Sequence, residues 1–148
     1  MSLAKFEKLT RKFFENEMTQ LSGNEYKMEG DSFIISNSNI SLSGHDDDIY
    51  MRISVSEMKG DIPYQAVISF VFDKLDRTLE NYDLINQFNA TVPFFTGNIT
   101  DKGYFKIQWH FAVFEPEEFV LCLNRAIIRL VNMDGDDHIL RKITARTH

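Results

Sequence analysis

The sequence of 148 residues has little cysteine, proline or glycine: it contains one cysteine, three prolines and seven glycines. Because Cys122 is the only cysteine, the chain cannot form an internal disulfide or a zinc site built from several thiolates. The glycines stand singly at expected turns. The sequence therefore contains neither a glycine-rich phosphate-binding loop nor a Gly-x-Ser-x-Gly nucleophile motif.

The sequence also lacks an excess of basic residues and a long apolar run. Its 16 lysines and arginines are outnumbered by 22 aspartates and glutamates, which gives a formal net charge of -6. This charge disfavours binding to nucleic acid or to an anionic membrane surface, although it would suit a basic partner. No run reaches transmembrane length, and no signal-peptide core precedes Leu21. We therefore expect a cytoplasmic protein with no nucleic-acid or membrane partner.

Phenylalanine, in contrast, is abundant, with 13 residues. A chain of this length suits one domain and can bury roughly 70% of its unfolded surface. The phenylalanines either fill an unusually aromatic core or line a dimer interface or a groove for an extended peptide. We expect residues 1–148 to form a single domain in which residues 133–148 are a mobile tail or a short helical extension.

Residues 3–21 are predicted to form an amphipathic helix. Apolar residues recur along it at helical spacing: Leu3, Phe6, Leu9, Phe13, Phe14, Met18 and Leu21. Ser22-Gly23-Asn24 is expected to end the helix, because glycine and asparagine accept a left-handed cap. The apolar stripe either packs on a sheet, which is its ordinary use, or binds a partner.

Residues 25–72 are predicted to form antiparallel strands. The expected elements are a hairpin of residues 25–29 and 32–35 around Gly30-Asp31, a turn at 36–39, an optional edge strand at 40–43, a half-buried strand at 49–55 and a strand at 65–72. The last of these is apolar throughout, so we expect a central strand that is covered on both faces.

A second helix is predicted to begin after Asp76, as its N-cap, and to end at Asn89. Residues 92–99 and 103–114 are then predicted to pair as a hairpin. Glu115 and Pro116 are expected to start a third helix, because proline and acidic residues suit the first turn.

This order of elements predicts an α+β fold, a twisted antiparallel sheet with three helices in the order α-β-β-(β)-β-β-α-β-β-α. Few expected strand pairs are separated by a helix, so a parallel doubly wound sheet is not expected. The candidate interface or binding surface lies on the expected strand at 65–72 and on the polar face of the expected strand at 103–114, and it consists of Phe70, Phe72, Tyr104, Lys106, Gln108 and His110.

The titratable residues show no catalytic or metal-binding pattern. His45 stands beside Asp46–Asp48, but consecutive side chains in an extended stretch point to opposite faces, and calcium-loop spacing is absent here and at Asp134–His138. Cys122 is expected to be buried and structural. His110 lies on a polar strand face without a motif for a nucleophile. We expect no catalytic residue, no metal and no cofactor.

The segment Leu84-Ile85-Asn86-Gln87-Phe88-Asn89 is similar to the Ile-Asn-x-aromatic-Asn segment of the YbjN-like family. The expected hairpin and the helix entered through Pro116 extend the resemblance over roughly residues 3–132. Residues 37–48 are longer than the family's usual connection, which leaves the pairing of the early strands open. Asn89 also has a structural interpretation as a helix cap, and Asn86 as a side chain that bonds the following turn.

The resemblance implies the type III secretion chaperone-like fold, in a small acidic cytoplasmic bacterial protein that is often dimeric. It implies no enzyme activity. Our first hypothesis is therefore a non-enzymatic protein-interaction module, chaperone-like or regulatory, that acts as a homodimer. The second is a small-ligand binding domain with an apolar, phenylalanine-lined pocket beneath the sheet. The third is an enzyme with dispersed catalytic residues such as His110.

Overall fold

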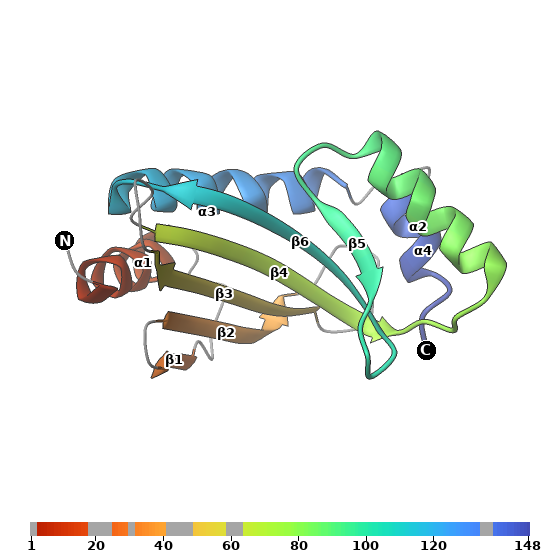
Figure 1. The fold of residues 1–148 in the computed structure, drawn as a ribbon, viewed down its shortest axis with the longest axis horizontal. Coiled ribbons are helices and arrows are strands. Elements are labelled where there is room, and N and C mark those ends of the chain that lie inside the picture. The colour runs from red at the N-terminus through yellow and green to blue at the C-terminus, as the bar shows by residue number, and fades with distance from the viewer. Residues whose placement is uncertain (1–2, 18–24, 30–31, 41–48, 59–63, 134–137) are drawn as a thin grey trace.

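The computed structural model describes residues 3–17, 25–29, 32–40, 49–58, 64–133 and 138–148. Within these residues, ten elements follow one another: α1 (Leu3–Glu17), β1 (Glu25–Glu29), β2 (Ser32–Ile40), β3 (Ile49–Glu57), β4 (Tyr64–Lys74), α2 (Leu79–Thr91), β5 (Thr96–Ile99), β6 (Tyr104–Val113), α3 (Pro116–Asn132) and α4 (Ile139–Thr144). The strands form one six-stranded antiparallel sheet in the order β1-β2-β3-β4-β6-β5 (Figure 1). The predicted α+β class with an antiparallel sheet is therefore confirmed.

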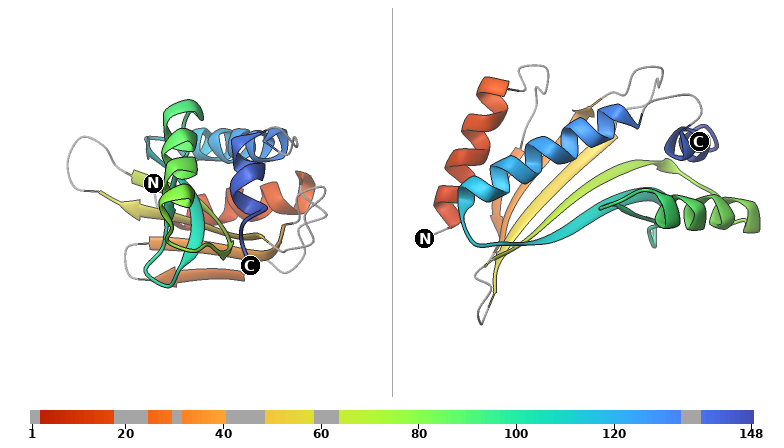
Figure 2. Two further views of the ribbon diagram at one scale, coloured as in Figure 1. Left: turned by 90° about the vertical axis from the view of Figure 1, so that its right-hand side faces the viewer. Right: turned by 90° about the horizontal axis from the view of Figure 1, so that it is seen from above.

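The described helices gather on one side of this curved sheet (Figure 2). Helices α1 and α3 contact each other, and they pack on the strands from β2 to β6. Helix α2 packs on β5, and α4 packs against α2 at the same end of the molecule (Figure 1). The opposite face of the sheet, which we call the outer face, carries none of these helices.

The one-sided covering corrects the prediction for β4. Its side chains toward the helices are buried: Tyr64, Ala66, Ile68, Phe70 and Phe72. Gln65, Val67 and Val71 on the outer face are only half-buried. The strand is central, as predicted, since β3 and β6 flank it. The prediction that both faces are covered is wrong, because the helices supply only one layer.

The turn predicted at residues 36–39 is also wrong. Strand β2 continues to Ile40, and its backbone pairs Ser36 with Arg52 and Asn37 with Met51 of β3 before a register irregularity. The ladder with β3 satisfies the backbone groups of this segment, which outweighs the local turn preference of serine and asparagine. The pairing of Glu29 with Ser32 confirms the first hairpin. Residues 41–48, which include most of the optional edge strand, lie outside the described residues.

Helix α2 is capped by different residues than the sequence indicated. Thr78, not Asp76, is the N-cap: its side-chain oxygen accepts a hydrogen bond of 3.2 Å from the Asn81 N–H. The Asp76 carbonyl instead accepts from the Asn81 side chain at 2.8 Å. At the other end, the Val92 N–H donates to the Phe88 carbonyl, so the helix passes Asn89 and ends at Thr91.

Asn89 has a different structural role, because its side chain joins α2 to β5. Its Nδ2 donates to the Gly97 carbonyl at 3.1 Å, and its Oδ1 accepts from the Gly97 N–H at 2.6 Å. A Cβ atom at Gly97 would lie 3.3 Å from both Phe88 and Phe105, so this close approach favours glycine. The strand predicted from Val92 begins only at Thr96.

We expect Asn89→Ala to lower the free energy of unfolding by about 1–3 kcal/mol, since it leaves the N–H and the carbonyl of Gly97 without their partners. Urea denaturation measures the difference. Asn86→Ala is the matched control, because Asn86 is exposed on the same helix and its replacement should change stability by less than about 0.5 kcal/mol. Equal losses in the two variants would contradict this role of Asn89.

The phenylalanines mainly form the core, which is the first of the two alternatives left open by the sequence. Among the phenylalanines whose side chains the structure describes, eight are buried: Phe6, Phe13, Phe70, Phe72, Phe88, Phe95, Phe105 and Phe119. Phe6 of α1 contacts Tyr64 of β4 edge-on at 4.6 Å between ring centroids. The apolar stripe of α1 therefore packs on the sheet. Phe111 is half-buried, and Phe94 and Phe114 are exposed, with exposed fractions of 54% and 49%.

The C-terminal residues from 138 onward form the short helical extension rather than an irregular tail. Leu140 and Ile143 of α4 are buried. Arg146 forms an ion pair of 3.1 Å with Glu80 and donates to the Asn81 side chain. These contacts hold the chain end against α2.

Candidate functional site

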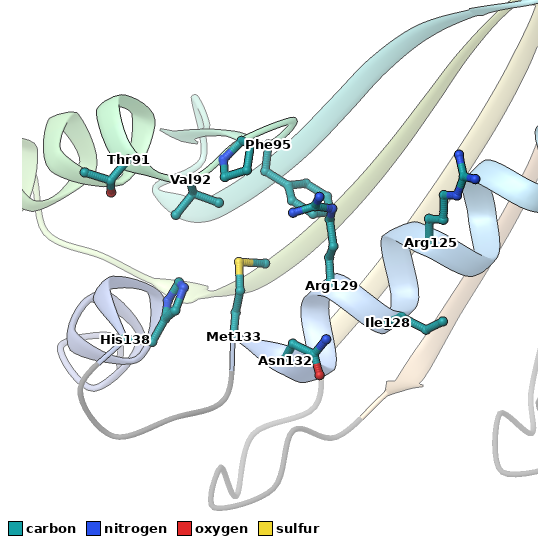
Figure 3. A pocket seen from close by; sticks show the side chains of 10 residues that line it. Thr91, Val92, Phe95, Arg125, Ile128, Arg129, Asn132, Met133 and His138 are labelled. Atoms are coloured by element: carbon teal, nitrogen blue, oxygen red, sulfur yellow. The ribbon is translucent and has the colours of Figure 1, made fainter.

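An open cleft of about 570 Å³ lies where three separate segments meet. The loop after α2, the C-terminal half of α3 and the start of α4 form its walls (Figure 3). Ten residues line it: Thr91, Val92, Pro93, Phe95, Arg125, Ile128, Arg129, Asn132, Met133 and His138. Its volume falls within the range of pockets that bind small molecules, about 300–1,000 Å³.

The lining of the cleft is positively charged, although the whole chain is acidic. Arg125 and Arg129 contribute two guanidinium groups, and no described residue of the lining is an aspartate or glutamate. The formal charge of the chain is -6. A concave surface that carries one sign of charge concentrates ions of the opposite sign, so this cleft favours anions.

The two arginines are positioned by α3. They are four residues apart, which places them on the same side of the helix. Figure 3 shows both side chains projecting from α3 toward the side of the cleft that holds Phe95. The guanidinium carbon of Arg129 lies 4.3 Å from the centroid of the Phe94 ring, a cation–π contact. The planar guanidinium keeps N–H donors for a carboxylate or phosphate.

Phe94 makes this contact through an unusual backbone conformation. Its φ is 73°, in the left-handed region that residues other than glycine seldom adopt. The turn exposes Phe94, whose ring contacts Trp109 at 5.3 Å, while the next residue, Phe95, is buried. Such strain persists only where the surroundings enforce it, and it is concentrated at binding and active sites.

His138 is the third nitrogen-bearing side chain of the cleft. Its Nδ1 accepts a hydrogen bond of 3.0 Å from the Leu140 N–H, which makes it the N-cap of α4. The acceptor role leaves the proton of the neutral ring on Nε2. Burial lowers the pKa of His138 from its ordinary value of 6.5, so the ring is neutral at pH 7 and offers one N–H donor.

The lowered pKa predicts a pH dependence of folding. The unfolded state takes up the His138 proton before the folded state does, so the neutral ring contributes its full stability above pH 6.5. This contribution is lost as the pH falls through the lower folded-state pKa. We expect His138→Asn, which keeps an N-cap that does not titrate, to lose less stability between pH 7 and pH 5 than the wild type. Urea denaturation at both pH values measures this, and identical pH profiles would contradict it.

Apolar groups complete the cleft. Phe95 and Met133 are buried at 3% and 6% exposure, Val92 is half-buried, and Ile128 is half exposed. The cleft therefore combines apolar groups with a cationic wall. This combination suits a ligand that has an anionic group at one end and an aromatic or aliphatic part at the other.

Catalytic groups are not assembled around this cleft in the described part of the chain. Cys122 lies on α3 outside the lining and is half-buried, less than expected. Burial raises the pKa of its thiol, an effect that the nearby Arg125 opposes, so the group stays mainly protonated at neutral pH. No group of three or more histidine, cysteine, aspartate or glutamate residues is placed to hold a metal ion among the described residues.

The candidate surface predicted from the sequence is divided between two faces. Tyr104, Lys106, Gln108 and His110 lie together on the outer face of β6, as predicted. Phe70 and Phe72 are buried beneath the helices, which corrects their assignment to an interface. Side chains alternate along a strand, and pairing aligns Phe70 with Ile107 on the core face. His45, Asp46–Asp48 and residues 134–137 lie outside the described residues.

The family-like motif is structural in part. Phe88 is fully buried and Asn89 bonds Gly97, while Asn86 is exposed. Sequence reasoning did not identify the cleft, because its residues come from segments 91–95, 125–133 and 138. The available signal was the pair Arg125 and Arg129, one helical turn apart, which the sequence analysis did not single out as a binding site.

The fold and the cleft define a class, an α+β domain with an open cationic cleft at one end of its sheet. No family model, no curated protein and no solved structure matches this chain. The resemblance to the YbjN-like family therefore stays a prediction. No helix in the described ranges is long and apolar enough to span a membrane.

Proposed function

We propose that this protein is a non-enzymatic binding domain whose cleft holds a small ligand with an anionic group and an apolar part. The observation that carries the proposal is the pairing of Arg125 and Arg129 in a lining without described acidic residues, beside the apolar Val92, Phe95 and Met133. This is the second hypothesis from the sequence, but the cleft is not the phenylalanine-lined pocket that was predicted beneath the sheet. The cleft lies between helices at one end of the sheet and contains a single phenylalanine in its lining.

Each wall of the cleft has a role in binding. The guanidinium groups donate to the ligand's carboxylate or phosphate, and each charge-assisted hydrogen bond contributes about 1.5–3 kcal/mol. The His138 Nε2–H supplies a further donor. The apolar groups bind the remainder of the ligand by removing its surface from water. The contact with Phe94 holds Arg129 in place before the ligand arrives, which reduces the ordering cost of binding.

A homodimeric, chaperone-like or regulatory interaction module in the cytoplasm remains the second candidate. The observation in its favour is the outer face of the sheet, which the described helices leave uncovered and where Tyr104 and His110 are exposed. The resemblance to the YbjN-like family supports the same proposal and, with it, the secretion chaperone-like fold. The two candidates are compatible, because the cleft lies on the helix side of the sheet.

Thermal denaturation with paired probes tests the ligand proposal. Octanoate and phenyl phosphate should raise the melting temperature in a concentration-dependent way, since a ligand that binds only the folded state stabilises it. Heptylammonium, which has the same alkyl chain as octanoate but the opposite charge on its head group, is the control and should not. Inorganic phosphate should act more weakly than phenyl phosphate, because it lacks the apolar part. If the cationic probe stabilises the protein as well as octanoate does, the proposal is wrong.

A further inference from the structure

One side of strand β6 is only partly covered by its neighbour. Strand β5 has four residues and reaches along β6 as far as the pair Thr96 and Gln108. The sheet order gives β6 no other neighbour on that side, so Trp109 to Val113 have none there among the described residues. We call these five residues the open segment. Figure 1 shows β5 beside only the part of β6 near the connecting turn.

The hydrogen-bonding pattern shows which backbone groups the open segment presents. The Thr100 N–H donates to the Tyr104 carbonyl at 2.8 Å, so Tyr104 turns its backbone toward β5. In an antiparallel ladder this orientation alternates, which assigns the same direction to Lys106 and Gln108. The next residues in the alternation are His110 and Ala112. Their N–H and carbonyl groups therefore point outward from the sheet, where β5 no longer reaches.

Phe94 and Phe95 of the loop before β5 contact the ring of Trp109 at the start of the open segment. The segment nevertheless lacks the charge and proline with which proteins prevent unwanted strand pairing. Its sequence is Trp-His-Phe-Ala-Val, without lysine, glutamate, proline or glycine. Edge strands are ordinarily protected by charge, proline, bulges or a covering element. Trp109 and Phe111, whose rings contact each other at 4.6 Å, also remain half-buried. An edge that combines free backbone groups, no charge and exposed aromatic area is suited to pair with another strand.

We propose that the open segment pairs antiparallel with the open segment of a second copy of this chain, forming a two-fold symmetric dimer. A two-fold axis at Phe111 places His110 opposite Ala112 of the second copy, and both residues present outward backbone groups. The two Phe111 side chains then meet on the core face. On the outer face, the small side chain of Ala112 leaves room for the imidazole of His110 from the second copy.

The length of the open segment fits this partner in particular. Continuing the pairing by one residue would place Phe114 opposite Gln108 of the second copy, a position that β5 already occupies there. The chain leaves the strand at Phe114 and enters α3 at Pro116. Each β6 therefore ends where the β5 of the other copy begins. No formally charged side chain lies in the segment, so two acidic chains can meet here without direct repulsion.

Proline substitution tests this pairing at a single donor. Ala112→Pro removes an N–H that points away from β4, so it should weaken the dimer at least tenfold while the far-ultraviolet circular dichroism spectrum is kept. Ala112→Val keeps the N–H and is the matched control. Sedimentation equilibrium from 5 to 500 µM should show dimers for the wild type and Ala112→Val, and at least a tenfold weaker association for Ala112→Pro. A wild type that stays monomeric throughout this range, or an Ala112→Pro variant that dimerises as well as the wild type, overturns the proposal.

Amide hydrogen exchange of the wild type provides a test that does not depend on a variant. In the dimer, the His110 and Ala112 amides should exchange at least tenfold more slowly at high than at low protein concentration. Fast exchange of both amides at all concentrations would show that this edge is unpaired and would equally overturn the proposal. A monomer whose edge becomes protected only on addition of another protein would assign the edge to a different partner.

Discussion

Replacing Phe119 with alanine should lower the free energy of unfolding by about 3–5 kcal/mol, the range observed for truncation of fully buried phenylalanines. Phe119 is 0% exposed. Its ring lies 5.9 Å from that of Phe6 and 6.4 Å from that of Phe111. It therefore joins α1 to α3 and α3 to the sheet. Its removal opens a cavity between α1, α3 and β6, and these three elements cannot easily move together to fill it.

Phe114→Ala is the control for this prediction. Phe114 is 49% exposed and lies five residues before Phe119, at the junction of β6 and α3. Its replacement should cost less than about 1 kcal/mol. Guanidinium denaturation of both variants gives the comparison. If Phe119→Ala costs no more than Phe114→Ala, the phenylalanines do not form the core in the way described.

Replacing both cleft arginines with glutamine should weaken binding of an anionic probe by about 100-fold or more. Two charge-assisted contacts of about 1.5 kcal/mol each give about 3 kcal/mol, and each 1.4 kcal/mol corresponds to a factor of ten. Glutamine keeps much of the side-chain length and the polarity but removes the charge and the planar fork of donors. Isothermal titration calorimetry with phenyl phosphate measures the effect.

The matched control for the arginine variant removes two positive charges elsewhere. Arg52 and Lys106 lie on the outer face of the sheet, away from the cleft. The double variant Arg52→Gln/Lys106→Gln should bind the probe within about threefold of the wild type, because charges separated by more than about 8–10 Å of solvent are screened. Equal weakening in both double variants would mean that net charge, and not the cleft, determines binding.

The strands and the long helices were predictable because their signals are local and repeated. The alternation in β6 predicts one shared face for Phe105, Ile107, Trp109, Phe111 and Val113. This face lies toward the core, where Phe105, Ile107 and Val113 are buried and Trp109 and Phe111 are half-buried. Helix α3 begins at Pro116, as predicted. These features depend on a periodicity of two or 3.6 residues that extends over many positions, so single exceptions do not obscure it.

The errors arose where a distant contact outweighed a local preference. Residues 36–39 favour a turn by composition, yet they belong to strand β2, which pairs with β3. Asn89 could have capped its helix, but Gly97 binds its side chain instead. The apolar run of β4 could not reveal that helices cover only one face. The cleft was missed for the same reason, since it exists only when α3, α4 and the loop at 91–95 meet.

A crystal structure of the protein with the tightest anionic probe tests the central claim most directly. The account predicts that the carboxylate or phosphate of the probe lies within hydrogen-bond distance, about 2.7–3.2 Å, of guanidinium nitrogens of Arg125 and Arg129, with its apolar part against Phe95 and Met133. A probe whose anionic group binds elsewhere, with both arginines facing solvent, would contradict it.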